Sequence, residues 1–217
     1  MDLLQGAFQY YLQNQAFFWQ AFRQHLALSL SALGISIVVS LPLGVWIACR
    51  AGLAQVVMNV FNAFRVIPSL AILFLALPYL GLGFLPSLVA PTVLAFPPVV
   101  INTYAGLRGV DPAVVEAAFG MGMAPLQVLR QVEIPLAMPV ILAGIRLATL
   151  STIGIATIAA YINAGGLGSL LFIGVITANY QKILAGSIAV SFLAITANYL
   201  LHFLERRAEI AIRGESK

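Results

Sequence analysis

Long apolar stretches separated by short polar segments are the main feature of the chain. A helix needs about 20 apolar residues to cross the hydrocarbon core of a bilayer. Stretches of that length predict five membrane-spanning helices, at 26–49, 56–80, 85–107, 136–161 and 183–203. Between Arg65 and Arg108 the chain has no Asp, Glu, Lys, Arg or His, and this run is too long for one helix. We place a turn inside it at 81–83, because Gly and Pro mark turns. The pattern predicts an all-α membrane protein with one transmembrane domain, 1–217.

The composition agrees with this interpretation. Of the 217 residues, 61% are hydrophobic and only 8% are charged, whereas a soluble domain carries about 25% charged residues. A water-facing globular surface and a disordered chain are therefore excluded, and the lipid bilayer is an expected partner. The single cysteine, Cys49, excludes a disulfide framework and a cysteine-based zinc site. The net charge of +4 comes from scattered basic residues, so no nucleic-acid partner is expected.

The positions of Lys and Arg predict the orientation, because cytoplasmic loops carry an excess of positive charge. With the N-terminus outside, the cytoplasmic side receives Arg50, Arg108, Arg130, Arg206, Arg207, Arg213 and Lys217, and the outside receives Arg23 and Lys182. The expected topology is N-terminus out and C-terminus in. It places the loop 108–135, between the third and fourth spans, and the tail 204–217 in the cytoplasm.

The first 22 residues mix glutamine with aromatic side chains. Such a mixture suits a segment that lies at the membrane–water interface, where aromatic rings settle. An ordinary polar lead-in to the first span is an equally good interpretation. We therefore expect 1–22 to be an interfacial segment and keep the alternative open.

The cytoplasmic loop predicts two short helices set at an angle. Asp111 is a good N-cap and Pro112 suits the first helical position. Gly120 and Gly122 should end this helix and permit a tight corner. Pro125 can start a second short helix, which we expect to end near residue 132, before Pro135. Such a knob suits contact with a partner protein, although a purely structural hairpin gives the same pattern.

The residues of this loop resemble a known motif. Glu116-Ala117-Ala118, then Gly122, then residues 132–135 ending in Pro135 resemble the EAA loop of ATP-binding-cassette importer permeases, and the spacing agrees throughout. Val132 and Ile134 are conservative departures from that motif. The residues from Asn163 to Gly168 resemble the external Gly-rich turn of methionine-importer-type permeases. Together these similarities cover nearly the whole chain, about residues 20–205.

Within that family the chain is most similar to osmoprotectant permeases, which import glycine betaine, carnitine and choline. The similar runs are 110–123, 136–146 and 152–157. Two departures occur in the loop. Phe119 stands where many members carry Arg or Lys, and Ala124 stands where many carry Ser or Thr. An importer of methionine or another amino acid is the alternative, and a secondary transporter is disfavoured because no Asp or Glu lies in a predicted span.

The resemblance implies partners that this chain does not contain. They are two cytoplasmic ATPase subunits, a second identical or homologous permease subunit, and an extracytoplasmic substrate-binding protein. No phosphate-binding loop occurs in the sequence, so ATP and magnesium should bind the ATPases, and this chain should carry no cofactor, metal or catalytic residue. The expected location is the bacterial inner membrane. The residues expected to couple to the ATPase are Glu116, Ala117, Ala118, Gly120, Gly122 and Pro135.

Candidates for the translocation path are polar or aromatic residues in or near the predicted spans. They are Arg65, Tyr104, Arg146, Tyr161 and Asn163. The glycines Gly165, Gly166 and Gly168 are assigned separately, to the external Gly-rich turn. A charge inside a span usually faces protein or water, and an aromatic ring can hold a quaternary ammonium group. Structural roles remain open for all of them: an arginine can snorkel or bind carbonyl groups, and a tyrosine can anchor at the interface.

Overall fold

The computed structural model describes residues 3–213, except for the side chains of residues 51, 53 and 213, and this range contains no strand. Four of its helices are long and apolar enough to cross a membrane, or five when the bent pair α3–α4 counts as one span. The helices are α1 (Leu3–Gln13), α2 (Gln15–Ala48), α3 (Ala51–Phe64), α4 (Ser69–Leu80), α5 (Phe84–Arg108), α6 (Pro112–Gly120), α7 (Pro125–Val128), the π-helical turn η1 (Leu129–Glu133), α8 (Ile134–Ile158), the 3₁₀ turn η2 (Ala159–Ile162), α9 (Gly168–Ile176) and α10 (Tyr180–Arg213).

The prediction of an all-α membrane protein is confirmed. The predicted first, third and fifth spans lie within α2, α5 and α10 to within one residue at their ends, and the fourth covers most of α8 and η2. The turn expected at 81–83 is also present, with φ values of +72° at Gly81 and +115° at Gly83. One element was not predicted: the segment between the fourth and fifth spans contains the short helix α9.

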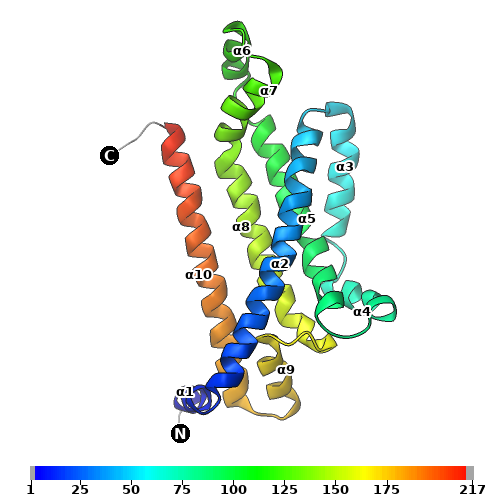
Figure 1. Cartoon of the computed structure of the whole chain (residues 1–217), viewed down its shortest axis with the longest axis vertical. Helices are drawn as coiled ribbons and strands as arrows, with labels where there is room; N and C mark the ends of the chain where they lie inside the picture. Colours follow the sequence, from blue (N-terminus) through cyan, green and yellow to red (C-terminus); the bar gives the residue numbers. More distant parts are fainter. Residues whose placement is uncertain (1–2, 214–217) are drawn as a thin grey trace.

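Helix α5 lies at the centre of the bundle, between α2 and α8 (Figure 1). Small residues bring these helices close together. A Cβ atom on Gly144 of α8 would lie 2.7 Å from the Pro98 carbonyl oxygen of α5, and one on Gly44 of α2 would lie 2.7 Å from the Cβ of Thr103. Close backbone approach at small residues drives helix association in membranes, where lipid is as apolar as leucine. The buried faces of α2, α5 and α8 consist mainly of Ala, Gly, Ser and Thr.

The second predicted span, 56–80, is not one straight helix. Helices α3 and α4 meet at a bend of 87°. Pro68 lacks an N–H group and disfavours helical geometry at the residue before it, so the helix stops at Phe64 and restarts at Ser69. The sequence predicted one continuous span here and no break. The actual break exposes four residues of non-helical backbone, and Arg65 lies within them.

The sequence predicted that the second helix of the 108–135 loop ends before Pro135, and this prediction is wrong. Residues 125–162 form one continuous helix that runs into the bundle. The π-helical turn η1 lies directly before Pro135. A π turn changes the hydrogen-bonding register, which lets the helix continue past a residue that has no N–H group. The knob is therefore joined to α8 without a break in the helix.

Both ends of the described chain are helical. Of residues 1–22, only α1 forms a separate segment, which lies across one end of the bundle (Figure 1), while residues 15–22 begin the long helix α2. Residues 204–213 of the expected tail continue α10, and residues 214–217 lie outside the described part of the chain.

Candidate functional site

The loop between α5 and α8 forms a two-helix knob, residues 111–128, that projects beyond the end of the bundle (Figure 1). Its first helix is capped as predicted: the Asp111 carboxylate accepts a hydrogen bond of 2.9 Å from the Ala113 N–H group. The corner is at Gly122, whose φ of +84° disfavours any L residue. Gly120 has no such φ value, and a Cβ there would meet no atom within 4 Å. The corner therefore requires glycine at 122 but not at 120.

The knob has a small buried centre and an apolar outer surface. Ala118 and Val128 are almost completely buried, whereas Glu116 and Ala117 are exposed. The exposed apolar side chains are Val114, Phe119, Met121 and Leu126. In the described part of the chain the Glu116 carboxylate has no hydrogen-bond or ion-pair partner. An apolar surface with one available carboxylate suits the groove of a protein partner.

Ala124 has no hydroxyl to accept a hydrogen bond from the third residue of the second helix, but the reciprocal capping bond is present. The Gln127 Oε1 atom accepts a hydrogen bond of 2.8 Å from the Ala124 N–H group. This bond satisfies one of the backbone donors that a helix start leaves unpaired. Pro135 is exposed at the base of the knob, directly after the π turn.

A cavity of about 440 Å³ opens beside the α3–α4 break. Its walls are residues of the break, one face of α5 and one face of α8. The polar lining residues are Arg65, Ser69, Asn102 and Ser151, and the apolar ones include Leu94, Pro98, Ile101, Leu147 and Ile155. Its volume lies within the range of small-molecule sites, roughly 300–1,000 Å³. Of the five path candidates, Arg65 alone lines this cavity.

Arg146 faces away from the cavity and toward α10. Its Nε atom lies 3.2 Å from Oε2 of Glu205, and its Nη1 atom lies 3.5 Å from Oδ1 of Asn198. His202 completes the group, with Nδ1 3.6 Å from the same Glu205 oxygen. Arg146 thus fastens α8 to α10. The sequence did not predict this partner, because Glu205 lies beyond the predicted fifth span.

The other three path candidates lie elsewhere in the bundle. Tyr104 packs beside the buried Ile47 and Val100, on the face of α5 that meets α2 and α3. Tyr161 and Asn163 lie near the opposite end from the knob. The Tyr161 ring is 4.6 Å from that of Phe172, and Asn163 ends η2 with a φ of +62°. The structure does not bring these residues together with Arg65.

The Gly-rich turn packs tightly against the start of α2. Gly165 and Gly166 have φ values of +74° and +77°. The Gly166 N–H group donates a hydrogen bond of 3.1 Å to Oε1 of Gln24. A Cβ on Gly168 would collide with the Thr157 carbonyl group. Gly165 and Gly166 are therefore needed for their positive φ, and Gly168 is needed because a side chain would not fit.

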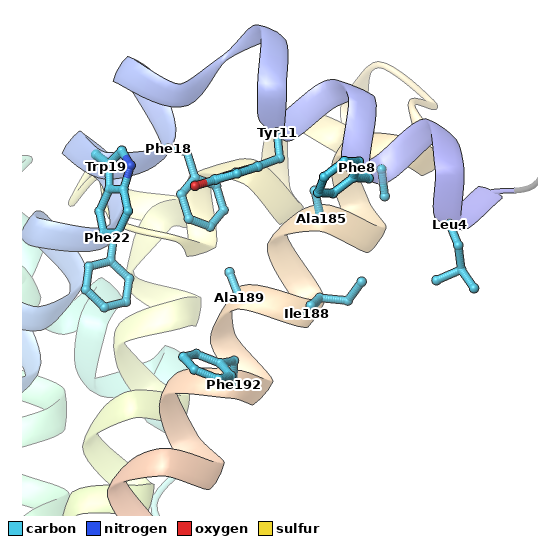
Figure 2. A pocket seen from close by; sticks show the side chains of 11 residues that line it. Leu4, Phe8, Tyr11, Phe18, Trp19, Phe22, Ala185, Ile188, Ala189 and Phe192 are labelled. Atoms are coloured by element: carbon cyan, nitrogen blue, oxygen red, sulfur yellow. The ribbon is translucent and has the colours of Figure 1, made fainter.

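An aromatic cleft of about 370 Å³ lies beside α1 (Figure 2), which is at the end of the bundle opposite the knob (Figure 1). Figure 2 shows side chains of α1 and of the start of α2 directed toward α10. The lining rings belong to Phe8, Tyr11, Phe18, Trp19, Phe22 and Phe192. At the start of α10, the Lys182 amine lies 5.9 Å from the centre of the Tyr10 ring of α1. This arrangement is typical of a helix resting on the membrane surface.

Residues 40–210 match the family described as binding-protein-dependent transport system inner membrane component. The chain is 40% identical over 184 residues to the choline transport system permease protein OpuBB of Bacillus subtilis (strain 168), covering 85% of each protein. It is 42% identical over 184 residues to the carnitine transport permease protein OpuCB of Listeria monocytogenes, covering 85% of this chain and 84% of that protein. It is 39% identical over 201 residues to the osmoprotectant import permease protein OsmW of Salmonella typhimurium, covering 90% of this chain and 94% of that protein.

Solved structures show the same fold. An inward facing structure of the MetNI methionine ABC transporter superposes with a TM-score of 0.81 at 22% identity, covering 90% of this chain and 98% of that one. A chain of an amino acid ABC transporter superposes with a TM-score of 0.74 at 23% identity, covering 92% of this chain and 98% of that one. With its several apolar helices, the chain is a multi-pass inner-membrane permease, and it belongs to the family of binding-protein-dependent transport system inner membrane components.

Proposed function

We propose that this chain is the permease subunit of an ATP-driven importer for quaternary ammonium osmoprotectants, namely glycine betaine, carnitine and choline. The substrate assignment is supported by the relatives, whose names specify choline, carnitine and osmoprotectant transport. The solved structures are less than 25% identical, so their amino-acid substrates define the alternative rather than the first choice.

The observation that carries the coupling role is the shape and surface of the knob. It is a sharp corner with an exposed apolar surface, and its second helix continues without interruption into the helix 125–162. One ATPase subunit binds this knob, and a second ATPase binds the knob of a second, identical or homologous permease. ATP and magnesium belong to the ATPases. A substrate-binding protein delivers the substrate at the opposite end of the bundle.

The knob faces the cytoplasm in this proposal. Arg50, Arg108 and Arg130 lie at or near its end of the bundle, as do Arg206 and Arg207 of α10 (Figure 1). Arg23 and Lys182 lie in the outer half, near the starts of α2 and α10. The positive-inside rule therefore supports an external N-terminus and a cytoplasmic knob.

The transport step follows from the connection between knob and cavity. Helices α5 and α8 enter and leave the knob, and both line the cavity beside Arg65. When the ATPases close, they move the two knobs, and α5 and α8 carry this displacement into the cavity walls. The cavity then opens alternately to the two sides of the membrane, as alternating access requires.

The test is uptake of labelled glycine betaine at high osmolarity by cells without betaine importers of their own. The cells carry this chain with its ATPase and binding protein, and unlabelled choline, carnitine and methionine serve as competitors. We expect ATP-dependent uptake that choline and carnitine inhibit and methionine does not. An assembled complex that hydrolyses ATP and takes up methionine but none of the three osmoprotectants would contradict the substrate assignment.

A further inference from the structure

Arg65 is the only charged side chain in the wall of the 440 Å³ cavity. Within residues 3–213 its guanidinium has no ion-pair or hydrogen-bond partner, whereas the other arginine in a predicted span, Arg146, is paired with Glu205. A charge at membrane depth is costly and usually meets a counter-charge or water. The cavity therefore offers a positive charge that has no negative partner among the described residues.

The backbone beside Arg65 adds to the positive potential. The break at Pro68 starts the 12-residue helix α4 at Ser69, which also lines the cavity. The first N–H groups of a helix are free of helical partners, and they carry the positive end of its dipole. In transporters, broken helices use such ends to hold anionic substrate groups. The guanidinium and the start of α4 thus favour an anion on this side of the cavity.

Acceptor groups lie in the wall formed by α5. Pro98 has no N–H group, so the Leu94 carbonyl lacks its usual helical donor, and both residues line the cavity. The Asn102 amide nitrogen donates to the Pro98 carbonyl at 2.7 Å, which leaves the Asn102 side-chain oxygen available. The remaining wall is mainly aliphatic. It can accommodate a quaternary ammonium group, whose methyl groups cannot donate ordinary hydrogen bonds.

We infer that Arg65 binds the carboxylate of zwitterionic substrates such as glycine betaine and carnitine as they pass through the cavity, and that it disfavours the cation choline. An arginine fork matches a carboxylate with two parallel hydrogen bonds, which makes it a strong partner. Choline carries the same trimethylammonium group without a carboxylate, so it meets only repulsion from the guanidinium. This inference rests on the proposed osmoprotectant function and assigns a selectivity residue to it.

The test compares substrates rather than absolute rates. Uptake of glycine betaine and choline is measured with the complete importer carrying Arg65→Gln, and each rate is divided by the wild-type rate for the same substrate. This division removes the preference of the binding protein. We expect betaine uptake to fall about tenfold or more, as for the loss of a charge-assisted hydrogen bond, and choline uptake to stay constant or rise. Arg65→Lys, which keeps the charge but not the fork, should give a smaller shift in the same direction.

Two further variants guard against a purely structural effect. Arg50→Gln removes a cation outside the cavity and should leave the betaine-to-choline ratio unchanged. Asn102→Asp adds a negative charge that competes for Arg65, so it should shift the ratio toward choline even if Arg65→Gln fails to assemble. Equal relative losses for both substrates in the Arg65 and Asn102 variants would overturn the inference and leave the proposed function intact. Failure of the assembled wild-type importer to take up either substrate would instead refute the proposed function.

Discussion

Two glycines of the knob should respond in opposite ways to alanine, although both lie at its corner. Gly122 has a φ of +84°, whereas Gly120 is the last residue of α6 and has no positive φ. A Cβ atom on either residue would meet no atom within 4 Å. Steric crowding is therefore absent at both positions, and the difference in backbone conformation acts alone.

The magnitudes follow from this backbone difference. An L residue in the left-handed region costs roughly 1–2 kcal/mol, so Gly122→Ala should destabilise the corner by about that amount. Gly120→Ala should be neutral or stabilise α6 by up to about 1 kcal/mol, because alanine favours the helix. Gly122→Asn should lie between the two, since asparagine tolerates positive φ better than alanine.

Hydrogen exchange of the knob in the purified importer measures this effect directly. A destabilisation of 1–2 kcal/mol raises the opening equilibrium about 5–30-fold. We therefore expect exchange in residues 111–128 to become faster by about this factor in Gly122→Ala, with less transport per ATP hydrolysed, and to be unchanged or slower in Gly120→Ala. Equal exchange in the two variants, or faster exchange only in Gly120→Ala, would refute the assignment of the corner to Gly122.

Three other changes test contacts elsewhere in the chain. Gly168→Ala pushes a Cβ into a backbone carbonyl of α8 and should lower the folding stability by roughly 1–3 kcal/mol. The Tm of the purified permease should then fall by about 2–10 °C. Gly154→Ala is the control, because a Cβ there meets open space and should not lower the Tm. Asp111→Ala removes the cap of α6 and should cost about 1 kcal/mol, measured as faster exchange in that helix. A double-mutant cycle that replaces Arg146 and Glu205 with Gln should give a coupling free energy of about 1 kcal/mol, because both side chains are partly exposed. Additive losses in that cycle would argue against the ion pair.

The spans and the first knob helix were predictable because each rests on local chemistry. Apolar length alone locates α2, α5, α8 and α10. Asp111 and Pro112 identify the start of α6 from two adjacent residues. The two errors in helix continuity both involve proline. The chain breaks at Pro68 and continues past Pro135, and the outcome depends on whether a π turn and neighbouring helices restore the lost hydrogen bond. Sequence shows the proline, but it does not show this compensation.

The polar contacts between helices were harder to predict for a different reason. In a soluble protein the apolar face of a helix identifies the core, but in a membrane both the lipid-facing and the buried faces are apolar. Helical spacing places Leu94, Pro98 and Asn102 on one face of α5, yet nothing in the sequence says that this face meets the cavity beside Arg65. The environment of Arg65 is a property of the packed bundle.

The two arginines of the predicted spans show how packing turns similar sequence contexts into different roles. Both lie in long apolar stretches, and composition predicts the same cost of burial for each. The fold places Glu205 within 3.2 Å of Arg146, so that its charge is satisfied within the chain and joins α8 to α10. Arg65 lies instead where α3 ends, beside a cavity and the start of α4, and its partner must come from outside the described residues. A charge retained without an internal partner stabilises the bundle less than a paired one would. Its position in the cavity wall therefore favours a role in contacting whatever passes through the cavity.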